Sequence, residues 1–371
     1  MKRTFAFIIP VFFGGFLFSD HKIQIMKNEQ SQIDGPYVMY KNDKVFVNYI
    51  YDQNGISVLK KDSLLLSQKG DIKLKIDGGS DGSFFEVQLQ KELNNEKTEF
   101  SGVNTIFAIS DIEGEFDAFK KLLVVNKVID EKYNWIFGKG HLVLTGDFFD
   151  RGVRVTETLW LIYSLEEKAR NAGGYVHFIL GNHEIMNLNN DLRYVHPKYM
   201  HSAKLMNENY LNLYGENSEL GRWLRTKNIT EKVGNVLFMH GGISSYVNMM
   251  DLSLTKMNKL ARPFYSDTTY NYKDPKVDLL FSDFGPFWYR GYYLGTPKAT
   301  LNQIDSTLSL YKVKHIATGH TVISDTISVL YNGKLLNTDV HHSKGHSEAL
   351  LIENGKFYRV TPFGEHFLIF Q

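Results

Sequence analysis

Residues 141–152 read HLVLTGDFFDRG, a short apolar run followed by a turn rich in glycine and acidic residues. The run His141–Thr145 predicts a buried strand, and the glycine after it permits a sharp turn. A strand that ends in such a turn presents one side chain rigidly at the edge of its sheet. Asp147 is therefore expected at a sheet edge, where side chains from other strand ends can meet it.

The same pattern occurs four more times. Each time, a short apolar run that predicts a strand is followed at once by a motif containing Asp, Asn or His. The runs and motifs are Thr105–Ile109 with Ser110–Gly114, Tyr175–Leu180 with Gly181–Glu184, Val236–Met239 with His240–Gly242, and His315–Thr318 with Gly319–Thr321. Oxygen and imidazole donors from five strand ends, without cysteine, are the ligands of a two-metal hydrolytic site.

The remaining periodicities predict an α/β fold of two packed mixed β-sheets flanked by helices. Amphipathic helices are expected at Phe116–Val128 and Val153–Asn171, between the first strands. Residues 188–232 are expected to be mostly helical, and 246–312 form an aromatic-rich insertion. The strands of the tail are predicted at Thr326–Tyr331, Leu335–Asn337, Ala349–Glu353 and Phe357–Val360, with hairpin turns between them.

Residues 20–100 predict a small antiparallel β module ahead of a catalytic domain at 101–371. Its strands are expected at Tyr37–Tyr40, Lys44–Tyr51, Ile56–Lys60 and Ile72–Ile76, and Glu92–Thr98 reads as a linker. Asp77–Gly82 faintly resembles a calcium loop, but the ligand spacing is wrong, so a turn between strands is favoured. Because no residue of the module matches a ligand or an acid, it is expected to be a brace or a partner surface that the chemistry does not need.

The first residues have the pattern of an export signal. Lys2 and Arg3 precede the apolar stretch Thr4–Phe18, which is shorter than a membrane span, and Ser19 is a small residue suited to cleavage. Residues 1–19 are therefore interpreted as a signal peptide, which implies a periplasmic or secreted protein with no stable membrane span after cleavage. A buried strand or an uncleaved membrane anchor is the alternative.

Composition excludes several classes of function. The 371 residues carry a net charge of +1, so no basic surface favours nucleic acid. The absence of cysteine excludes thiolate metal sites, cysteine nucleophiles and structural disulfides. Nothing in the sequence indicates an oligomeric state.

Taken together, the five motifs resemble those of the calcineurin-like metallophosphoesterases. The ending Asp150-Arg151-Gly152 is typical of the phosphoprotein phosphatase group within that family. Gly181–Asn187, Asp191–Val195 and Gly285–Gly291 are similar to the bacterial-type branch called Shewanella-like phosphatases. The resemblance covers about residues 103 to 365.

The resemblance implies two divalent metal ions. Asp147 would bridge both, Asp111 and Glu113 would complete the first metal's ligands, and Asn182, His240 and His320 would complete the second's. In the family the first motif usually has His where this chain has Glu113. Because a carboxylate is harder than an imidazole, this change favours manganese, or magnesium, over iron or zinc. Alternatively, Glu113 caps a helix that begins near Glu115.

The resemblance also implies the groups that act on substrate. His183 would protonate the leaving oxygen, with Asp150 holding its ring, and Arg151 and Arg290 would bind phosphate. A structural ion pair with Asp283 is the alternative for Arg290.

Other candidate residues are weaker. Arg222 and Arg225 suit either phosphate contact or a helix surface. His177 is expected in the core. For His341 and His342, surface or packing roles are favoured over an approach to the metals.

The sequence therefore predicts an exported, metal-dependent phosphatase that hydrolyses phosphate monoesters. A phosphodiesterase or nucleotide pyrophosphatase is the alternative with the same chemistry. A catalytically weak binding protein is the alternative of another class. Phosphoproteins, sugar phosphates and nucleotides all remain open as substrates, because the two insertions at 188–232 and 246–312 carry no pattern that identifies one.

Overall fold

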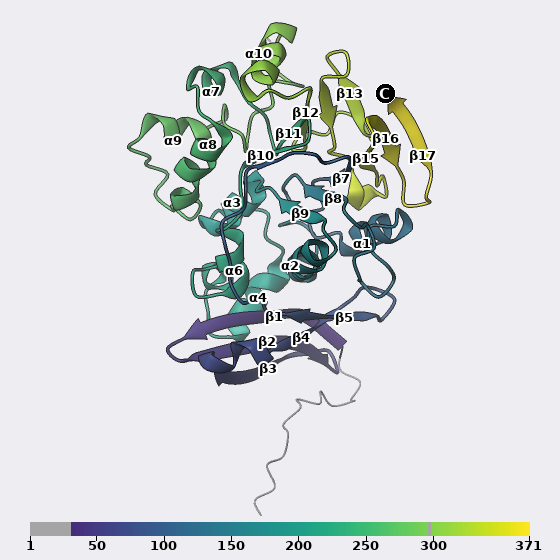
Figure 1. Cartoon of the computed structure of the whole chain (residues 1–371). Helices are drawn as coiled ribbons and strands as arrows, with labels where there is room; N and C mark the ends of the chain where they lie inside the picture. The colour runs from purple at the N-terminus through teal and green to yellow at the C-terminus, as the bar shows by residue number, and fades with distance from the viewer. Residues whose placement is uncertain (1–30, 296–297) are drawn as a thin grey trace, which may run out of the picture.

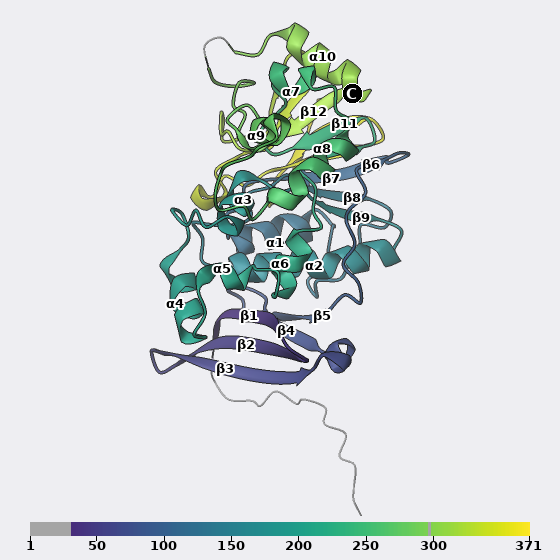
Figure 2. The ribbon, with the colours of Figure 1, turned by 90° about the vertical axis from the view of Figure 1, so that its left-hand side faces the viewer.

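The computed structural model describes residues 31–371 except 296 and 297. The expected signal peptide at 1–19 lies outside the described residues. Figures 1 and 2 show a layered molecule, with the N-terminal sheet below, two larger sheets in the middle and helices between and above them. Across the described ranges, every helix is too short or too polar to span a membrane.

The first large sheet has six strands in the order β17-β16-β15-β7-β8-β9. Its parallel strands β7 (Thr105–Ile109), β8 (His141–Leu144) and β9 (Tyr175–Phe178) are the predicted strands that precede the first three motifs. The antiparallel strands β15, β16 and β17 extend this sheet with residues of the tail. They span Ala349–Glu353, Lys356–Val360 and His366–Phe370.

The second large sheet has the order β13-β14-β12-β11-β10-β6. Its central strands β11 (Val236–Met239), β12 (His315–Thr318) and β14 (Leu335–Asn337) are parallel to one another. β10 (Thr230–Val233) runs antiparallel to β11, and β13 (Ser328–Leu330) runs antiparallel to β14. The two sheets pack face to face through a buried apolar cluster. The predicted fold, two packed mixed sheets flanked by helices, is confirmed.

Two helices cover the outer face of the first sheet, and the other helices follow the third motif or lie in the insertions. α1 (Phe116–Val125) ends three residues earlier than predicted, because Lys127 has a left-handed backbone that a helix cannot continue through. α2 (Val155–Asn171) begins two residues later than predicted. The other α-helices are α3 Asn182–Leu188, α4 Pro197–Leu205, α5 Tyr210–Leu213, α6 Glu219–Leu224, α7 Ser245–Met249, α8 Leu254–Ala261, α9 Pro275–Phe281 and α10 Leu301–Tyr311.

The N-terminal module consists of two small antiparallel sheets. β1 (Ser31–Lys41), β2 (Lys44–Gln53) and β3 (Ile56–Leu65) form one, and β4 (Lys73–Asp77) and β5 (Phe84–Gln88) form the other. The loop at 77–82 joins β4 to β5, so its interpretation as a turn between strands is confirmed.

Two strands of residues 31–100 were not predicted. β5 alternates exposed and buried side chains, which is the pattern of a half-buried strand. β6 (Glu99–Phe100) pairs in parallel with β10, so the end of the segment assigned to the module is part of the second large sheet. Two residues are too few for a periodic signal.

The module packs against α2 and α4 through buried polar contacts. The Trp160 indole donates to the carbonyl of Pro36 at 2.8 Å. Asp34 is 1% exposed, and its carboxylate accepts hydrogen bonds from Tyr37 at 2.8 Å, from Thr156 at 3.1 Å and from Ser202. These contacts support the expectation that the module acts as a brace.

The brace reaches the segment that follows the second motif. Asp77, at the end of β4, forms an ion pair with Arg154 just before α2. Lys198 of α4 donates both to the carbonyl of Ile33 in β1, at 2.9 Å, and to the carbonyl of Val153. The module thus contacts the Arg154 side chain directly and the Val153 carbonyl through Lys198, three and two residues from Arg151.

Asp34→Ala is expected to destabilise the whole chain, because it leaves three buried hydroxyl groups without an acceptor. The loss should be about 1–3 kcal/mol in the free energy of unfolding, measured by urea denaturation. Asp43→Ala is the matched control, since Asp43 lies exposed in the turn after β1. Equal stabilities of the two variants would contradict the role given to Asp34.

Candidate metal centre

The five motifs meet where the carboxyl ends of the parallel strands of both sheets converge. Here a cavity of about 340 Å³ is lined by seven of the ten predicted site residues: Asp111, Glu113, Asp147, Arg151, His183, Arg290 and His320. The other three, Asp150, Asn182 and His240, are buried beside them and contact His183, His240 and Asp147. The structure therefore brings all ten residues together.

Close backbone approach explains the glycine before Asp147. A Cβ atom on Gly146 would lie 2.5 Å from the Gly181 nitrogen and 2.8 Å from Nδ1 of His240, and the residue has φ +89°. Any larger residue would force the second and third motifs apart.

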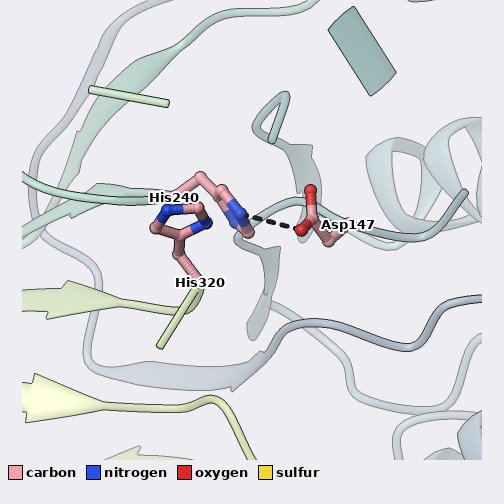
Figure 3. Close-up of side chains that lie close together, drawn as sticks. All are labelled: Asp147, His240 and His320. Carbon is pink, nitrogen blue, oxygen red and sulfur yellow. Dashed lines mark ion pairs between the residues drawn. The ribbon is translucent and has the colours of Figure 1, made fainter. Parts of the chain in front are cut away.

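One corner of the site brings together Asp147, Asn182 and His240. Figure 3 shows Asp147 with His240 and with His320, which lies beside them. Nδ1 of His240 lies 2.7 Å from the carbonyl of Thr145, so this nitrogen carries a hydrogen and donates it. Nε2 then lies 3.0 Å from Oδ2 of Asp147 and 2.9 Å from Oδ1 of Asn182. Nε2 faces two oxygens, so a positive charge is needed between them; a proton on Nε2 supplies it in the metal-free chain, and a metal ion can take the place of that proton.

The charges at this corner support the same conclusion. Burial alone would lower the pKa of His240, but the carboxylates of Asp147 and Asp111 outweigh burial and raise it to about 10. Burial alone would raise the pKa of Asp147, but His240 and His183 outweigh burial and lower it. The carboxylates thus favour a positive charge at Nε2 of His240, which a divalent ion would supply when bound.

His320 offers a neutral imidazole to the same corner. Its Nε2 donates to the carbonyl of Trp288 at 3.1 Å, which leaves Nδ1 as a lone pair. Burial, and then the nearby His240, hold the pKa of His320 well below its ordinary value. A metal requires the neutral form of histidine, so His320 is suited to be a ligand. Ligand atoms of Asp147, His240 and His320 all lie within 4.8 Å of one another.

A second corner is formed by Glu113, Asp147 and His183, and Asp111 lines the cavity beside them. The Asp111 carboxylate accepts a hydrogen bond from the backbone nitrogen of His320 at 3.1 Å. Burial, and also the charge of Asp147, raise the pKa of Asp111 to about 6. Ligand atoms of Glu113, Asp147 and His183 lie within 4.8 Å of one another. Two of the three residues in this group are carboxylates, the donor type that manganese and magnesium favour.

Glu113 forms an ion pair with Arg151. Its alternative role as a helix cap receives no support, because α1 begins after Glu115 and has no side-chain cap hydrogen bond. The Arg151 guanidinium is 47% exposed, so it is free to reach a ligand in the cavity while it contacts Glu113.

Six of the candidate residues adopt the left-handed backbone region, which is uncommon outside glycine. They are Asp111, Glu113, Asp147, Asp150, Arg151 and His320, with φ between +48° and +70°. Each such residue costs about 1–3 kcal/mol, and the surrounding packing has to impose it. The fold therefore holds these side chains in fixed directions at a cost in stability, as active sites commonly do.

His183 lies at the centre of a chain of hydrogen bonds. Its Nδ1 is 2.5 Å from Oδ2 of Asp150, and Oδ1 of Asp150 accepts from Asn187 at 2.8 Å. Asn187 in turn accepts from the hydroxyl of Tyr210. Asp150 thereby fixes the ring so that Nε2 points toward Asp147, whose Oδ2 is 3.7 Å away.

The environment favours the protonated form of His183. Burial alone would lower its pKa, but the charge of Asp147 and the contact with Asp150 outweigh burial and raise it. A protonated imidazole with one nitrogen held by a carboxylate can donate the proton on its other nitrogen.

Glu184 was not among the site residues predicted from the sequence, but it holds the second and third motifs together. Its buried carboxylate accepts from the backbone nitrogens of Asp147 at 2.9 Å, Phe148 at 2.8 Å and Gly181 at 2.7 Å. Burial, and then the charge of Asp147, raise its pKa to about 7. A signal was present, because an acid three residues after a helix N-cap typically turns back to bind backbone nitrogens.

Of the remaining candidate residues, some line the cavity and others lie elsewhere in the structure. Arg290 lines the cavity and donates to the carbonyl of His320 and, at 3.1 Å, to Thr321. The ion pair with Asp283 is not present among the described residues. The ring of Tyr194, another residue without a predicted role, lies 5.2 Å from both the His183 ring and the Arg151 guanidinium.

The weaker arginine candidates lie elsewhere. Arg222 stacks over the ring of Tyr40 at 5.0 Å, and Arg225 binds the carbonyls of Tyr214 and Gly221 at 2.8 Å. Neither lines the cavity, which favours structural roles on α6 for both.

Three histidines outside the motifs have packing contacts. His177 is fully buried between Glu231 and His141, so the prediction that it packs in the core is confirmed. His342 is buried against Ser347, and His341 contacts Asp325 at 2.7 Å. Both His341 and His342 also line the cavity, near the predicted metal ligands.

Comparison with known proteins gives consistent matches. The family described as calcineurin-like phosphoesterase matches residues 105–324. Shewanella-like protein phosphatase 1 of Plasmodium berghei is 30% identical over 224 residues, or 58% of this chain and 60% of that protein. Shewanella-like protein phosphatase 2 of Arabidopsis thaliana is 33% identical over 102 residues, or 28% of this chain and 26% of that protein. The chain thus spans less than two thirds of the length of these relatives.

Among solved structures, the cold-active protein-tyrosine phosphatase of a psychrophilic Shewanella species superposes with a TM-score of 0.81 and 37% identity. The match covers 91% of this chain and 99% of that one. Because residues 101–371 alone are under three quarters of the chain, the match includes much of the N-terminal module.

Glu113→Gln keeps the size of the side chain and removes its charge, so it should weaken metal binding at the second corner. Activity should fall and be partly restored by excess manganese. Glu113→His should move the metal preference toward zinc or iron. Calorimetric titration of the metal-stripped full chain with each metal tests this. Metal affinities equal to wild type in both variants, beside a lowered melting temperature, would make Glu113 a structural residue.

Proposed function

Because the chain belongs to the calcineurin-like phosphoesterase family, we propose that it is a metal-dependent phosphatase that hydrolyses phosphate monoesters. The observation that carries this proposal is the position of His183. A histidine held by Asp150 faces the carboxylate that both groups of metal ligands share, with two arginines on the same cavity. This is the arrangement that cleavage of a phosphate ester requires.

The proposal includes two divalent ions, with manganese preferred and magnesium, iron or zinc as alternatives. Asp147 would bridge the two ions, Asp111 and Glu113 would hold the first, and Asn182, His240 and His320 would hold the second. Bound metal ions would activate water and neutralise the charge of the phosphoryl oxygens. The donor types support this, since each corner combines carboxylates or neutral nitrogen and oxygen donors in a buried place.

The residues of the chain perform the remaining tasks. His183 donates its Nε2 proton to the leaving oxygen, and Asp150 keeps the ring in the orientation and tautomer that this needs. Arg151 and Arg290 bind the phosphate oxygens with paired guanidinium hydrogens. The contact between Glu113 and Arg151 orients the exposed guanidinium toward the cavity.

We further propose that the substrate is a phosphorylated protein, with phosphotyrosine as the preferred residue. The Shewanella structure carries the name of a protein-tyrosine phosphatase. In this chain, the half-exposed ring of Tyr194 lies beside His183 and Arg151, where it can contact an aromatic leaving group. Export through residues 1–19 is also part of the proposal; an intact N-terminus on protein recovered from outside the cytoplasm would argue against a cleaved signal.

The reaction class is tested with p-nitrophenyl phosphate and bis(p-nitrophenyl) phosphate, in the presence of manganese. The monoester should be hydrolysed and the diester should not, because the two arginines of the proposed site would bind the oxygens of a terminal phosphate. Turnover of the diester alone would favour a phosphodiesterase. Absence of both activities in protein that binds metal would favour a binding protein.

His183→Asn should reduce turnover of the monoester by about 10²–10⁴-fold while both metal ions remain bound, because it removes the acid and no metal ligand. The metal content of the variant is measured by mass spectrometry. His201→Asn, an exposed histidine on α4, is the matched control and should keep full activity. A His183→Asn variant with wild-type turnover would mean that another group protonates the leaving oxygen.

A further inference from the structure

Asp339 occupies a sixth strand end beside the predicted ligands. β14 runs parallel to β12, with Thr318 opposite Asn337. Asp339 therefore follows β14 by two residues, just as His320 follows β12 by two residues. Since the two strands run side by side in register, Asp339 and His320 leave their sheet at the same edge.

Thr338, the residue before Asp339, connects the end of β14 to the segments that carry the first two motifs. Oγ1 of Thr338 lies 2.9 Å from the carbonyl of Thr318, 3.0 Å from the hydroxyl of Ser110 and 3.3 Å from the hydroxyl of Thr145. Ser110 directly precedes Asp111, and Thr145 lies two residues before Asp147. Thr338 thus stands where the strands that carry both carboxylates converge.

The Asp339 side chain has the surroundings of a ligand. It is 5% exposed and lines the same cavity as Asp111, Asp147 and His320. Its backbone nitrogen donates to Asn337 at 2.8 Å, but its carboxylate has no hydrogen bond or ion pair within the described ranges. A carboxylate buried to this degree normally has a partner, because leaving it without one costs several kcal/mol.

His240 and then Arg290 are the positive groups that act on this carboxylate, and Arg290 is otherwise engaged. Its guanidinium donates to the carbonyl of His320 and to Thr321 and forms no ion pair with Asp339 in the described part of the chain. The strongest charge interaction of Asp339 is with another carboxylate, that of Asp111. Two acids side by side at a cavity wall are stable when a cation lies between them.

We propose that Asp339 is a further ligand of the first metal ion, beside Asp111, Glu113 and Asp147. The inference rests on the proposed function, since it assumes the two metal sites described above. It would give the first site a fourth protein donor. A site built from four carboxylates is hard and strongly anionic, and it would favour manganese or magnesium.

Asp339→Asn tests the proposal by metal binding rather than by activity. The metal-stripped full chain is titrated with Mn²⁺ by calorimetry, and electron paramagnetic resonance tells a coupled manganese pair from a single ion. Wild type should bind two ions as a coupled pair. The variant should bind one ion with wild-type affinity and the other about 10–100-fold more weakly, and it should show the signal of a single ion.

The matched control is Asp305→Asn, which removes the same charge from a half-exposed carboxylate on α10 paired with Lys334, away from the cavity. It should bind both ions as wild type does. Asp339→Ser carries the same test if near-ultraviolet circular dichroism shows that Asp339→Asn does not fold, and Asp339→Glu should retain the coupled pair.

Two wild-type affinities in Asp339→Asn would overturn the proposal. A raised KM for phosphate ester at unchanged manganese affinity would mean that Asp339 acts on Arg290 instead. Failure of the wild-type chain to bind a pair of ions would refute the dinuclear site itself, and this outcome is distinct from the other two.

Discussion

The arrangement of the site depends on the position of the Asp147 carboxylate. Glu184, in the third motif, accepts hydrogen bonds from the backbone nitrogens of Asp147 and Phe148 in the second motif and of Gly181 in its own. Asp147 in turn contacts His240 and accepts from the backbone of His183 at 2.9 Å. The buried carboxylate of Glu184 thus fixes the turn that carries Asp147. Asp147 in turn lies between both groups of proposed metal ligands and His183, the proposed acid. Any shift of that turn would separate all three.

The electrostatics of the site also follow from the position of the Asp147 carboxylate. Five carboxylates and four imidazoles line one cavity, and the burial of Asp111, Asp147 and Asp339 reduces the screening of their charges by water. The chain compensates part of the negative charge with Arg151 and Arg290 and leaves the remainder for a cation. The N-terminal module contributes indirectly, because Asp77 and, through Lys198, β1 contact the segment next to Arg151.

Much of the fold and of the candidate site could be predicted from the sequence, because strand ends followed by glycine and a polar residue form a local pattern. β7, β11 and β12 have the predicted bounds, and all ten predicted site residues converge. Asp339 escaped prediction although it follows β14, since Asn337 and Thr338 separate it from the apolar run. Tyr194 and the contact of Glu113 with Arg151 depend on tertiary approach between separate loops. β6 became visible only through its pairing with β10, which no local pattern encodes.

The central claim is that two metal ions share Asp147. Diffraction from crystals of the full chain grown with manganese, measured on both sides of the manganese absorption edge, tests it most directly. Two anomalous peaks about 3.5–4 Å apart, one on each side of the Asp147 carboxylate, are the predicted result. A single peak, or two peaks that do not both contact Asp147, would contradict the account.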